Sequence, residues 1–132
     1  MIEITRDPID VGAVVGSVRR DEAGAIVMFL GTVRADPNVA VLDYEVYVPM
    51  ATKVLTDLAD KATAKFSLTG VSIVHRLGRV PVGDDSVAIA CSAAHRREAF
   101  GACRWVMDEV KRIVPIWKSE PPRRASGKKR SR

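Results

Sequence analysis

The sequence predicts an α+β domain in which helices pack on a largely antiparallel β-sheet. Two observations carry this prediction. Residues 49–66 and 96–114 place apolar side chains at helical spacing over four or more turns. Shorter apolar runs fall in neighbouring pairs, as strands joined by hairpins do. The predicted order is strand, helix, two strands, helix, two strands, helix and a final extended segment.

The first half of the chain supplies three strands and two helices. Residues 2–5, "IEIT", are a short strand, and residues 8–19 are an amphipathic helix weakened by two glycines. Residues 25–34, "AIVMFLGTVR", are an apolar run typical of a buried strand. Residues 39–48 alternate in polarity, so we expect them to form a hairpin with 25–34. Helix 49–66 opens with proline in its first turn, a favourable position.

The second half predicts a strand pair and a long helix. Residues 71–78 and 86–95 are expected as strands on either side of a turn at 79–85, "RVPVGDD". The helix at 96–114 should place Phe100, Cys103, Met107, Val110 and Val114 on its apolar face. Pro115 should end it, because proline lacks the amide donor and its ring clashes with the preceding turn. The residues that follow are expected to be extended.

Composition indicates one folded domain at residues 1–120 and a basic, disordered tail at 121–132. The chain has 132 residues, 47% hydrophobic and 28% charged, which suits a single globular domain. The net charge is +5, but six of the 21 Lys and Arg residues lie in the tail, leaving 15 against 16 acidic residues in the body. No secretory signal or membrane-spanning run is visible, so we expect a cytoplasmic protein. Cys91 and Cys103 lie among apolar residues and are interpreted as buried, inert thiols.

Candidate chemistry is limited to cationic residues at the ends of the predicted elements. The chain contains no P-loop, GxGxxG, CxxC or HExxH motif, and its two histidines are too isolated to predict a metal site. Arg34 follows a buried strand, and His95 and Arg96 begin a helix, where free amide groups favour an anion. The alternative for each is an ordinary solvated charge. His75, within a strand, is interpreted as structural.

Lys111 and Lys118 flank the apolar run Ile113 to Trp117. Lys111 alone is explained by a solvated helix face, where Asp108 and Glu109 could pair with Lys111 and Arg112. Lys118 follows Trp117 in an extended segment, so partial burial at a pocket rim is expected. A desolvated lysine, or one near another cation, has a lowered pKa and can serve as a nucleophile or proton carrier.

Five motifs in order resemble the large, catalytic subunit of molybdopterin synthase. They are "GTVR" (31–34), "YEVYVPM" (44–50), "VSIVHRLGRVPVGD" (71–84), "SAAHR" (92–96) and "MDEVKRIVPIWKSE" (107–120). The resemblance spans about Gly24 to Glu120. It implies an α/β-hammerhead-like fold, consistent with the α+β class predicted from the pattern of elements.

The resemblance also implies a reaction and its partners. The family converts cyclic pyranopterin monophosphate (precursor Z) into molybdopterin by installing the two dithiolene sulfurs, as a step of molybdenum cofactor biosynthesis. Sulfur arrives as a thiocarboxylate on the C-terminal Gly-Gly of a small ubiquitin-like subunit. Two large subunits form a homodimer with one small subunit at each end, giving a heterotetramer. No cofactor or metal is implied, and a partner that delivers sulfur would make a reactive cysteine in this chain unnecessary.

Matching motifs imply the site residues. Lys111 and Lys118 are the implied catalytic residues, and Lys111 corresponds to a lysine considered essential in the family. Arginine forks suit a monophosphate, and a histidine can donate to it or move a proton. The implied substrate-binding set is Thr32, Val33, Arg34, His95, Arg96, Lys111, Lys118, Ser119 and Glu120.

A second hypothesis is a non-catalytic module that holds RNA or another polyanion with its basic tail. The body charge of −1 and an aromatic content of 5% argue against nucleic-acid binding. Deletion of 121–132 separates the two hypotheses, since an enzyme should keep most of its activity and a tail-dependent binder should lose its affinity.

Overall fold

A computed structural model describes residues 1–37, 41–113 and 116–119, and its largest unit is a four-stranded sheet. The strand order is β1-β4-β6-β2. β1 runs parallel to β4, whereas β4 with β6 and β6 with β2 are antiparallel. The bounds are β1 (Ile2–Thr5), β2 (Ala25–Thr32), β4 (Leu68–Arg76) and β6 (Asp85–Ala93). This sheet supports the helices on both of its faces.

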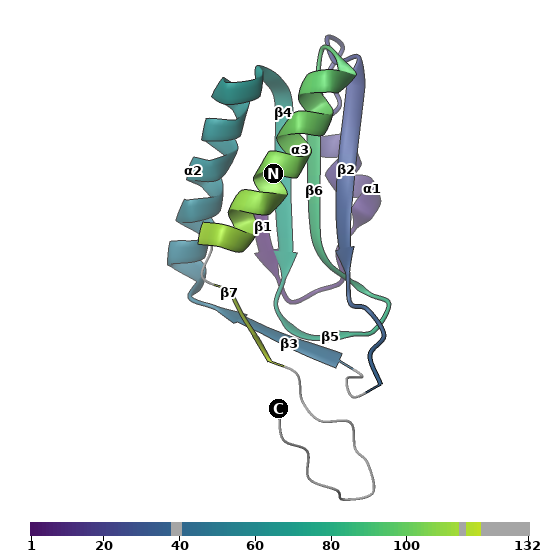
Figure 1. Ribbon diagram of the computed structural model, residues 1–132, viewed down its shortest axis with the longest axis vertical. Coiled ribbons are helices and arrows are strands. Elements are labelled where there is room, and N and C mark those ends of the chain that lie inside the picture. Colours follow the sequence, from purple (N-terminus) through teal and green to yellow (C-terminus); the bar gives the residue numbers. More distant parts are fainter. Residues whose placement is uncertain (38–40, 114–115, 120–132) are drawn as a thin grey trace, which may run out of the picture.

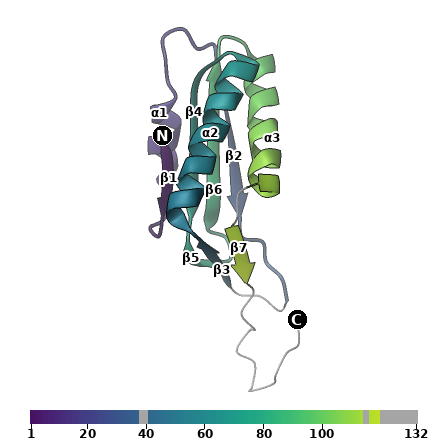
Figure 2. The same cartoon turned by 90° about the vertical axis from the view of Figure 1, so that its left-hand side faces the viewer.

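Helices cover the two faces of the four-stranded sheet unequally. The long helices α2 (Val48–Phe66) and α3 (Arg96–Ile113) lie side by side on one face, and the short helix α1 (Val11–Ser17) lies on the other (Figure 2). The central strand β6 is buried on both faces. Its Ile89 packs with α2 and α3, whereas its neighbour Ala88 packs with Val14 of α1. The alternation follows from the two-residue repeat of a strand.

A second, three-stranded sheet lies at one end of the molecule (Figure 1). Its order is β5-β3-β7, and both pairings are antiparallel. The bounds are β3 (Val41–Val46), β5 (Gly78–Pro81) and β7 (Ile116–Ser119). Val33, Tyr44, Leu77 and Val80 form a small core beneath it. β7 begins shortly after α3 ends, so this sheet lies beside the C-terminal end of that helix.

Local sequence explains where the helices begin and end. The Asp10 carboxylate accepts a hydrogen bond of 3.0 Å from the amide of Ala13, which caps α1. Proline lies in the first turn of α2, and Ser67 ends this helix in a left-handed conformation with φ 53°. In the last turns of α3, Arg112 pairs with Glu109 at 2.7 Å. This is the i,i+3 pairing that the sequence predicts.

Several predictions are confirmed. The fold is α+β with a largely antiparallel arrangement, and the two long helices lie where their periodicity predicts them. Cys91 and Cys103 are free and buried. The segment after the last helix is extended and forms β7. The predicted boundary at residue 120 and the tail at 121–132 lie outside the described residues.

Other predictions are wrong, and the errors share one cause. Strand β3 pairs with β5 and β7 rather than with β2, so the predicted hairpin of 25–34 with 39–48 does not form. The predicted turn at 79–85 contains most of β5. β2 is an edge strand in which Phe29 keeps 38% of its surface exposed, rather than a buried strand. Each error concerns pairing between distant segments, which local patterns do not specify.

The helices also differ in detail from the prediction. α1 spans seven residues, shorter than the predicted 8–19. Phe100 is 62% exposed and does not lie on the core face of α3, because Ala99, Ala102 and Val106 occupy that face with Cys103 and Val110. No helix in the described ranges combines the length and the apolar character needed to cross a membrane.

Candidate functional site

The candidate site is a cavity of about 460 Å³ where the end of β2, the C-terminal half of α3 and strand β3 meet. Its volume lies within the range of small-molecule sites, roughly 300–1,000 Å³. Its apolar walls are Phe29 and Leu30 of β2, Val87 of β6, and Met107 and Val110 of α3. We call it the Lys111 pocket, after the only charged side chain that lines it among the described residues.

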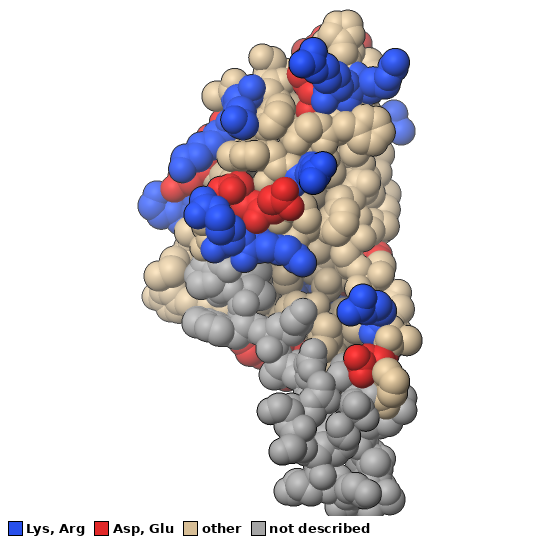
Figure 3. All heavy atoms as spheres, in the orientation of Figure 1, with Lys and Arg blue, Asp and Glu red and all other residues tan. Residues whose placement is uncertain are grey.

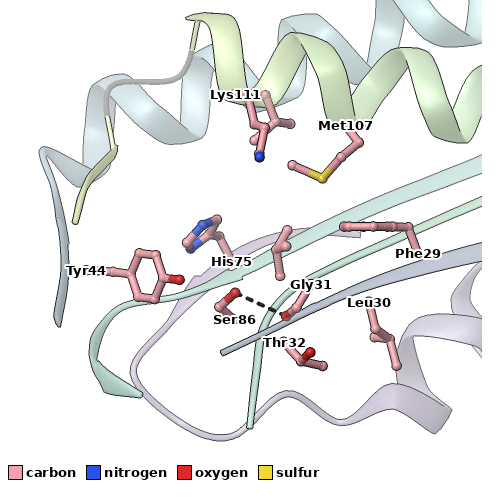
Figure 4. Close-up of a pocket in the computed structure, with 11 residues that line it drawn as sticks. Phe29, Leu30, Gly31, Thr32, Tyr44, His75, Ser86, Met107 and Lys111 are labelled. Carbon is pink, nitrogen blue, oxygen red and sulfur yellow. Dashed lines mark hydrogen bonds between the residues drawn. The ribbon is translucent and has the colours of Figure 1, made fainter. Parts of the chain in front are cut away.

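Lys111 enters the pocket from the last turn of α3. Its side chain points from the helix toward the space above His75, with Met107 one turn earlier on the same side (Figure 4). Residues four apart share one face of a helix, so α3 presents both side chains to the pocket. No carboxylate lines this pocket within the described ranges. The site therefore carries a positive charge and suits an anionic ligand.

Strand β2 reaches the pocket at an irregular point of its pairing with β6. The register shifts between Gly31 and Thr32, and the Ser86 hydroxyl donates a hydrogen bond of 3.1 Å to the carbonyl of Gly31. A Cβ at Gly31 would lie 2.6 Å from Cγ1 of Val87, so the backbone there has no room for a side chain. This close approach holds Thr32 at the pocket wall (Figure 4).

His75 of β4 and Tyr44 of β3 form the opposite wall. Their ring centroids lie 5.3 Å apart with an interplanar angle of 72°, an edge-to-face contact. His75 is 7% exposed, and its Nδ1 lies 2.8 Å from the carbonyl oxygen of Arg76. Burial lowers the pKa of His75, and the hydrogen bond to Arg76 opposes this shift only in part. Burial thus favours the neutral form of the imidazole.

Sequence reasoning missed His75 and Tyr44 as lining residues. The sequence favours a structural role for His75, because a histidine within an apolar strand gives no local sign of facing a cavity. Alternation along β4 places His75 on the same face as the buried Ile73, toward α3. Only the position of Lys111 above that face distinguishes His75 from a core residue.

Of the predicted site residues, the structure brings Thr32 and Lys111 together in one pocket. Val33 is 3% exposed and packs in the small core with Tyr44, so its side chain is unavailable to a ligand. Arg34 follows β2 on the surface. It makes no hydrogen bond or ion pair with another described residue.

His95 and Arg96 lie far from Lys111. Both are exposed at the N-terminal end of α3, whereas Lys111 is in its last turn. Fifteen residues separate Arg96 from Lys111, which is about 22 Å along the axis at 1.5 Å per residue. One small ligand cannot contact both ends within a single copy of the chain.

Strand β7 places the backbone of two further predicted residues. Lys118 is opposite Tyr44, and Ser119 is opposite Asp43, in the antiparallel register of β3 with β7. The side chains of these two residues and the whole of Glu120 lie outside the described part of the structure. The backbone of Lys118 thus runs beside a strand that lines the Lys111 pocket.

Charges elsewhere on the surface are mixed in sign. On the face shown in Figure 3, basic side chains over α2 and α3 are interspersed with acidic ones and do not form one continuous basic surface. Within the described ranges, no three His, Cys, Asp or Glu side chains are grouped as ligands for a metal ion. The Lys111 pocket remains the best-formed candidate for chemistry.

Comparison with known proteins connects this geometry to a family. The family model described as MoaE protein matches residues 4–113. The molybdopterin synthase catalytic subunit of Thermoplasma volcanium is 44% identical over 122 residues, covering 90% of this chain and 89% of that protein. The corresponding protein of Coccidioides immitis is 48% identical over the same share of this chain, which spans 62% of that protein's length.

Solved structures of related proteins have the same fold as this chain. The crystal structure of molybdopterin synthase from Staphylococcus aureus has a TM-score of 0.87 and 35% identity, covering 92% of this chain and 91% of that one. This likeness supports the predicted hammerhead-like architecture. A complex of subunits 1 and 2 of molybdopterin-converting factor from Helicobacter pylori has a TM-score of 0.78 over 90% of this chain. Its identity of 21% indicates a common fold alone.

Proposed function

The chain belongs to the MoaE family of molybdopterin synthase catalytic subunits, and from this premise we propose that the Lys111 pocket is where it transfers sulfur. The family reaction converts precursor Z to molybdopterin. The observation that carries the proposal is a single cation, Lys111, directed into a cavity whose described lining contains no carboxylate. A monophosphate substrate and a thiocarboxylate donor are both anions, and a low-polarity cavity strengthens their attraction to one ammonium group.

Sulfur comes from a partner protein in this proposal. A small ubiquitin-like subunit inserts its C-terminal Gly-Gly thiocarboxylate into the Lys111 pocket, where the thiocarboxylate sulfur forms a bond to a carbon of the pterin side chain. Two features support an external donor. Cys91 and Cys103 are both buried in the core, so neither thiol can reach a substrate in the pocket. The Helicobacter pylori structure is described as a complex between subunits 1 and 2 of molybdopterin-converting factor, and a two-subunit assembly fits such an arrangement.

Lys118 is proposed as the second lysine of the site. Its backbone is opposite Tyr44, which lines the pocket. The antiparallel register sets the backbone of Lys118 beside a residue of the pocket wall, which supports its assignment to the site. Ser119 and Glu120 continue the same segment and are proposed to contact the substrate or the partner's C-terminus.

His95 and Arg96 are proposed to act on the site of a second copy. They lie about 22 Å along α3 from Lys111 at 1.5 Å per residue, so they cannot share a monophosphate with Lys111 of their own copy. In a two-fold homodimer each copy gives the other the same surface, and antiparallel α3 helices would bring the first turn of one beside the last turn of the other. Arg34, two residues beyond Thr32, is proposed to bind the phosphate within its own copy.

An assay with purified components tests the function. The chain is mixed with thiocarboxylated small subunit and precursor Z, and molybdopterin formation is compared among the wild-type protein, Lys111→Ala and Lys118→Ala. Each substitution should lower turnover by about 100-fold or more, the usual contribution of a general acid or base. Lys53→Ala is the matched control, since Lys53 is exposed on α2 and pairs with Asp57 at 3.2 Å on the same helix. Wild-type turnover in both folded pocket variants would contradict the proposal.

A further inference from the structure

His75 is a buried side chain of the Lys111 pocket to which the transfer step proposed above gives no task. It projects from β4 beneath Lys111 and beside Tyr44, and its ring forms part of the cavity wall (Figure 4). With 7% of its surface exposed, it has little contact with water except through this cavity. A buried, ionisable side chain at a cavity wall is a candidate for function.

Hydrogen bonding fixes the tautomer of His75. Its Nδ1 lies 2.8 Å from the backbone carbonyl oxygen of Arg76, which can only accept a hydrogen bond. Nδ1 therefore carries the hydrogen, and in the neutral ring Nε2 carries a free lone pair. No described residue donates a hydrogen bond to Nε2. The ring therefore has an unoccupied acceptor in the pocket.

The surroundings of His75 favour the neutral ring. Burial lowers its pKa, and the charged group in the pocket wall is the ammonium of Lys111, which opposes a second positive charge. The pairing partners of His75 on the flanking strands are the apolar Ile4 of β1 and Val87 of β6. Tyr44 faces the ring edge to face from β3.

No carboxylate lines the pocket within the described ranges. The guanidinium of the neighbouring Arg76 is paired with Asp84 at 3.0 Å. His75 is therefore a neutral base with nothing in the described pocket to stabilise its cation.

The proposed sulfur transfer requires a base after the carbon–sulfur bond has formed. At that stage the sulfur joins the pterin carbon to the terminal carbonyl of the small subunit as a thioester. Water must then attack the carbonyl carbon, so that a carbon–oxygen bond forms and the acyl carbon–sulfur bond breaks. The sulfur stays on the pterin as a thiolate and the partner leaves with a carboxylate. The water gives up two protons, one during attack and one when the new carboxylic acid ionises.

We propose that His75 is the general base of this release step, accepting on Nε2 the proton that the attacking water loses. The inference rests on the proposed function and deepens it by assigning the cleavage of the partner's thioester to a named residue. The proton then leaves Nε2 for solvent through the open side of the pocket, and the second proton goes directly to solvent. Histidine is the side chain best suited to this exchange near neutral pH.

Other polar groups of the pocket are poorly suited to this role. Lys111 as an ammonium ion can donate a proton but cannot accept one. The Ser86 hydroxyl is committed to the Gly31 carbonyl. The hydroxyls of Thr32 and Tyr44 are very weak bases. Among the described lining residues, His75 is the base available to a water molecule.

Two substitutions of His75 distinguish a role as a general base from a purely structural role. In His75→Asn the side-chain amide can still donate to the Arg76 carbonyl, as Nδ1 does, but nothing replaces Nε2. In His75→Gln the longer side chain can place a hydrogen-bonding oxygen near the Nε2 position, but it cannot take up a proton. Both variants are compared with wild type and Lys53→Ala for thermal unfolding, and folded variants go forward.

The test is a single-turnover reaction with thiocarboxylated small subunit and precursor Z, quenched over time and analysed by intact-protein mass spectrometry. Wild type should release the small subunit as its carboxylate. Both variants should still form the covalent adduct between small subunit and pterin but release it about 100-fold or more slowly, so that the adduct accumulates. Release at the wild-type rate in either variant would overturn the inference. In His75→Asn it would show that the reaction does not need Nε2, and in His75→Gln it would show that the reaction does not need a basic group at this position.

The pH dependence of the release rate gives a second readout. Failure of the proposed function and failure of the role of His75 give different results. The rate of release in wild type should fall on acidification with a midpoint below the ordinary histidine value of 6.5, because burial lowers the pKa of His75. This acidic limb should vanish in His75→Gln, and its persistence there would contradict the inference. If the wild-type protein forms neither adduct nor molybdopterin, the proposed function fails. If it forms both and the variants match it, only the role of His75 fails.

Discussion

Lys118 of β7 stands directly opposite Tyr44 of β3 in antiparallel register. Tyr44 also lines the Lys111 pocket and packs edge to face against His75. Lys111 lies in the last turn of α3 and lines the pocket, and Lys118, seven positions later in the chain, lies in a strand paired with the pocket wall. The end of α3 lines the cavity and β7 pairs with a strand that lines it, so the lysines at the two ends of the apolar run lie at the pocket and beside one of its walls.

Tyr44 should be as important to the stability of the small sheet as to the pocket. It is buried with Val33, Leu77 and Val80, so Tyr44→Ala leaves a cavity and should lower the free energy of unfolding by about 3 kcal/mol. Tyr44→Phe keeps the ring against His75 and should cost less than about 1 kcal/mol. Urea denaturation monitored by circular dichroism measures both values. Equal losses in the two variants would mean that the hydroxyl, rather than the ring, stabilises this sheet.

Lys111→Arg asks whether the pocket needs a positive charge or an amine. Arginine keeps the charge but cannot lose its proton near neutral pH, and its planar group is larger than an ammonium. We expect substrate binding close to wild type and turnover lowered by about 100-fold or more, as expected when an acid–base or nucleophilic group is lost. Calorimetric titration with precursor Z and the molybdopterin assay provide the two measurements. Turnover near the wild-type rate would reduce Lys111 to an electrostatic anchor.

Mixing two inactive variants tests whether two copies share the site. Lys111→Ala and Arg96→Ala should each be inactive alone. If Arg96 of one copy serves the Lys111 pocket of the other, a mixed dimer has one intact site and one doubly altered site. After equal mixing and subunit exchange, half of the dimers are mixed, so about a quarter of wild-type activity should return. A mixture with no more activity than its components would place both residues in the site of one copy or exclude Arg96 from it.

The helices could be predicted closely because their signals are local. α2 and α3 each carry a long apolar stripe, and proline lies at the start of α2. Pairing of strands is different. β3 meets β5 about 35 residues later and β7 about 75 residues later in the chain, as the paired residues of each register show. Nothing in the alternation of residues 41–46 distinguishes those partners from the nearer β2.

The residues of the site also differ in how well they could be predicted from the sequence. Lys111 could be predicted from its position at the end of a helix and from the family resemblance. The sequence motif places Val33 in the site with its neighbours Thr32 and Arg34, whereas in the structure Val33 is buried. His75 could not be found from sequence, since histidine among apolar strand residues usually satisfies a structural role. Its significance depends on which helix lies above it, and this is a property of the tertiary fold.

Stability should depend on pH through His75. The folded protein lowers the pKa of His75 below the ordinary value of 6.5, so the unfolded chain binds this proton more readily. The free energy of unfolding should therefore be greatest above pH 6.5 and fall as the pH drops from 6.5 through the folded pKa. Urea denaturation across about pH 5.5 to 7.5 measures the slope, which His75→Asn should reduce. This range lies above the one in which Glu109 titrates, since Arg112 lowers the pKa of that carboxyl. An unchanged slope in the variant would assign the dependence to another group.

Two glycines should respond to alanine in opposite directions. Gly24 immediately precedes β2, and a Cβ there would overlap the backbone carbonyl oxygen of Ala94, so backbone atoms would have to move. Gly24→Ala should lower the free energy of unfolding by about 1–3 kcal/mol, the usual cost of overpacking. Gly16 lies within α1, where a Cβ would meet no atom within 4 Å beyond its chain neighbours and the backbone of its own helix, and alanine is the better helix former there. Gly16→Ala should therefore raise the free energy of unfolding by about 0.5–1 kcal/mol.

Thermal and urea unfolding of the two variants, made in the same background, compare a position fixed by a backbone contact with one that has room for a methyl group. If Gly24→Ala were as stable as wild type, the start of β2 would be able to move away from the end of β6. The edge strand that carries Thr32 to the pocket would then be less firmly held than its hydrogen bonds to β6 indicate.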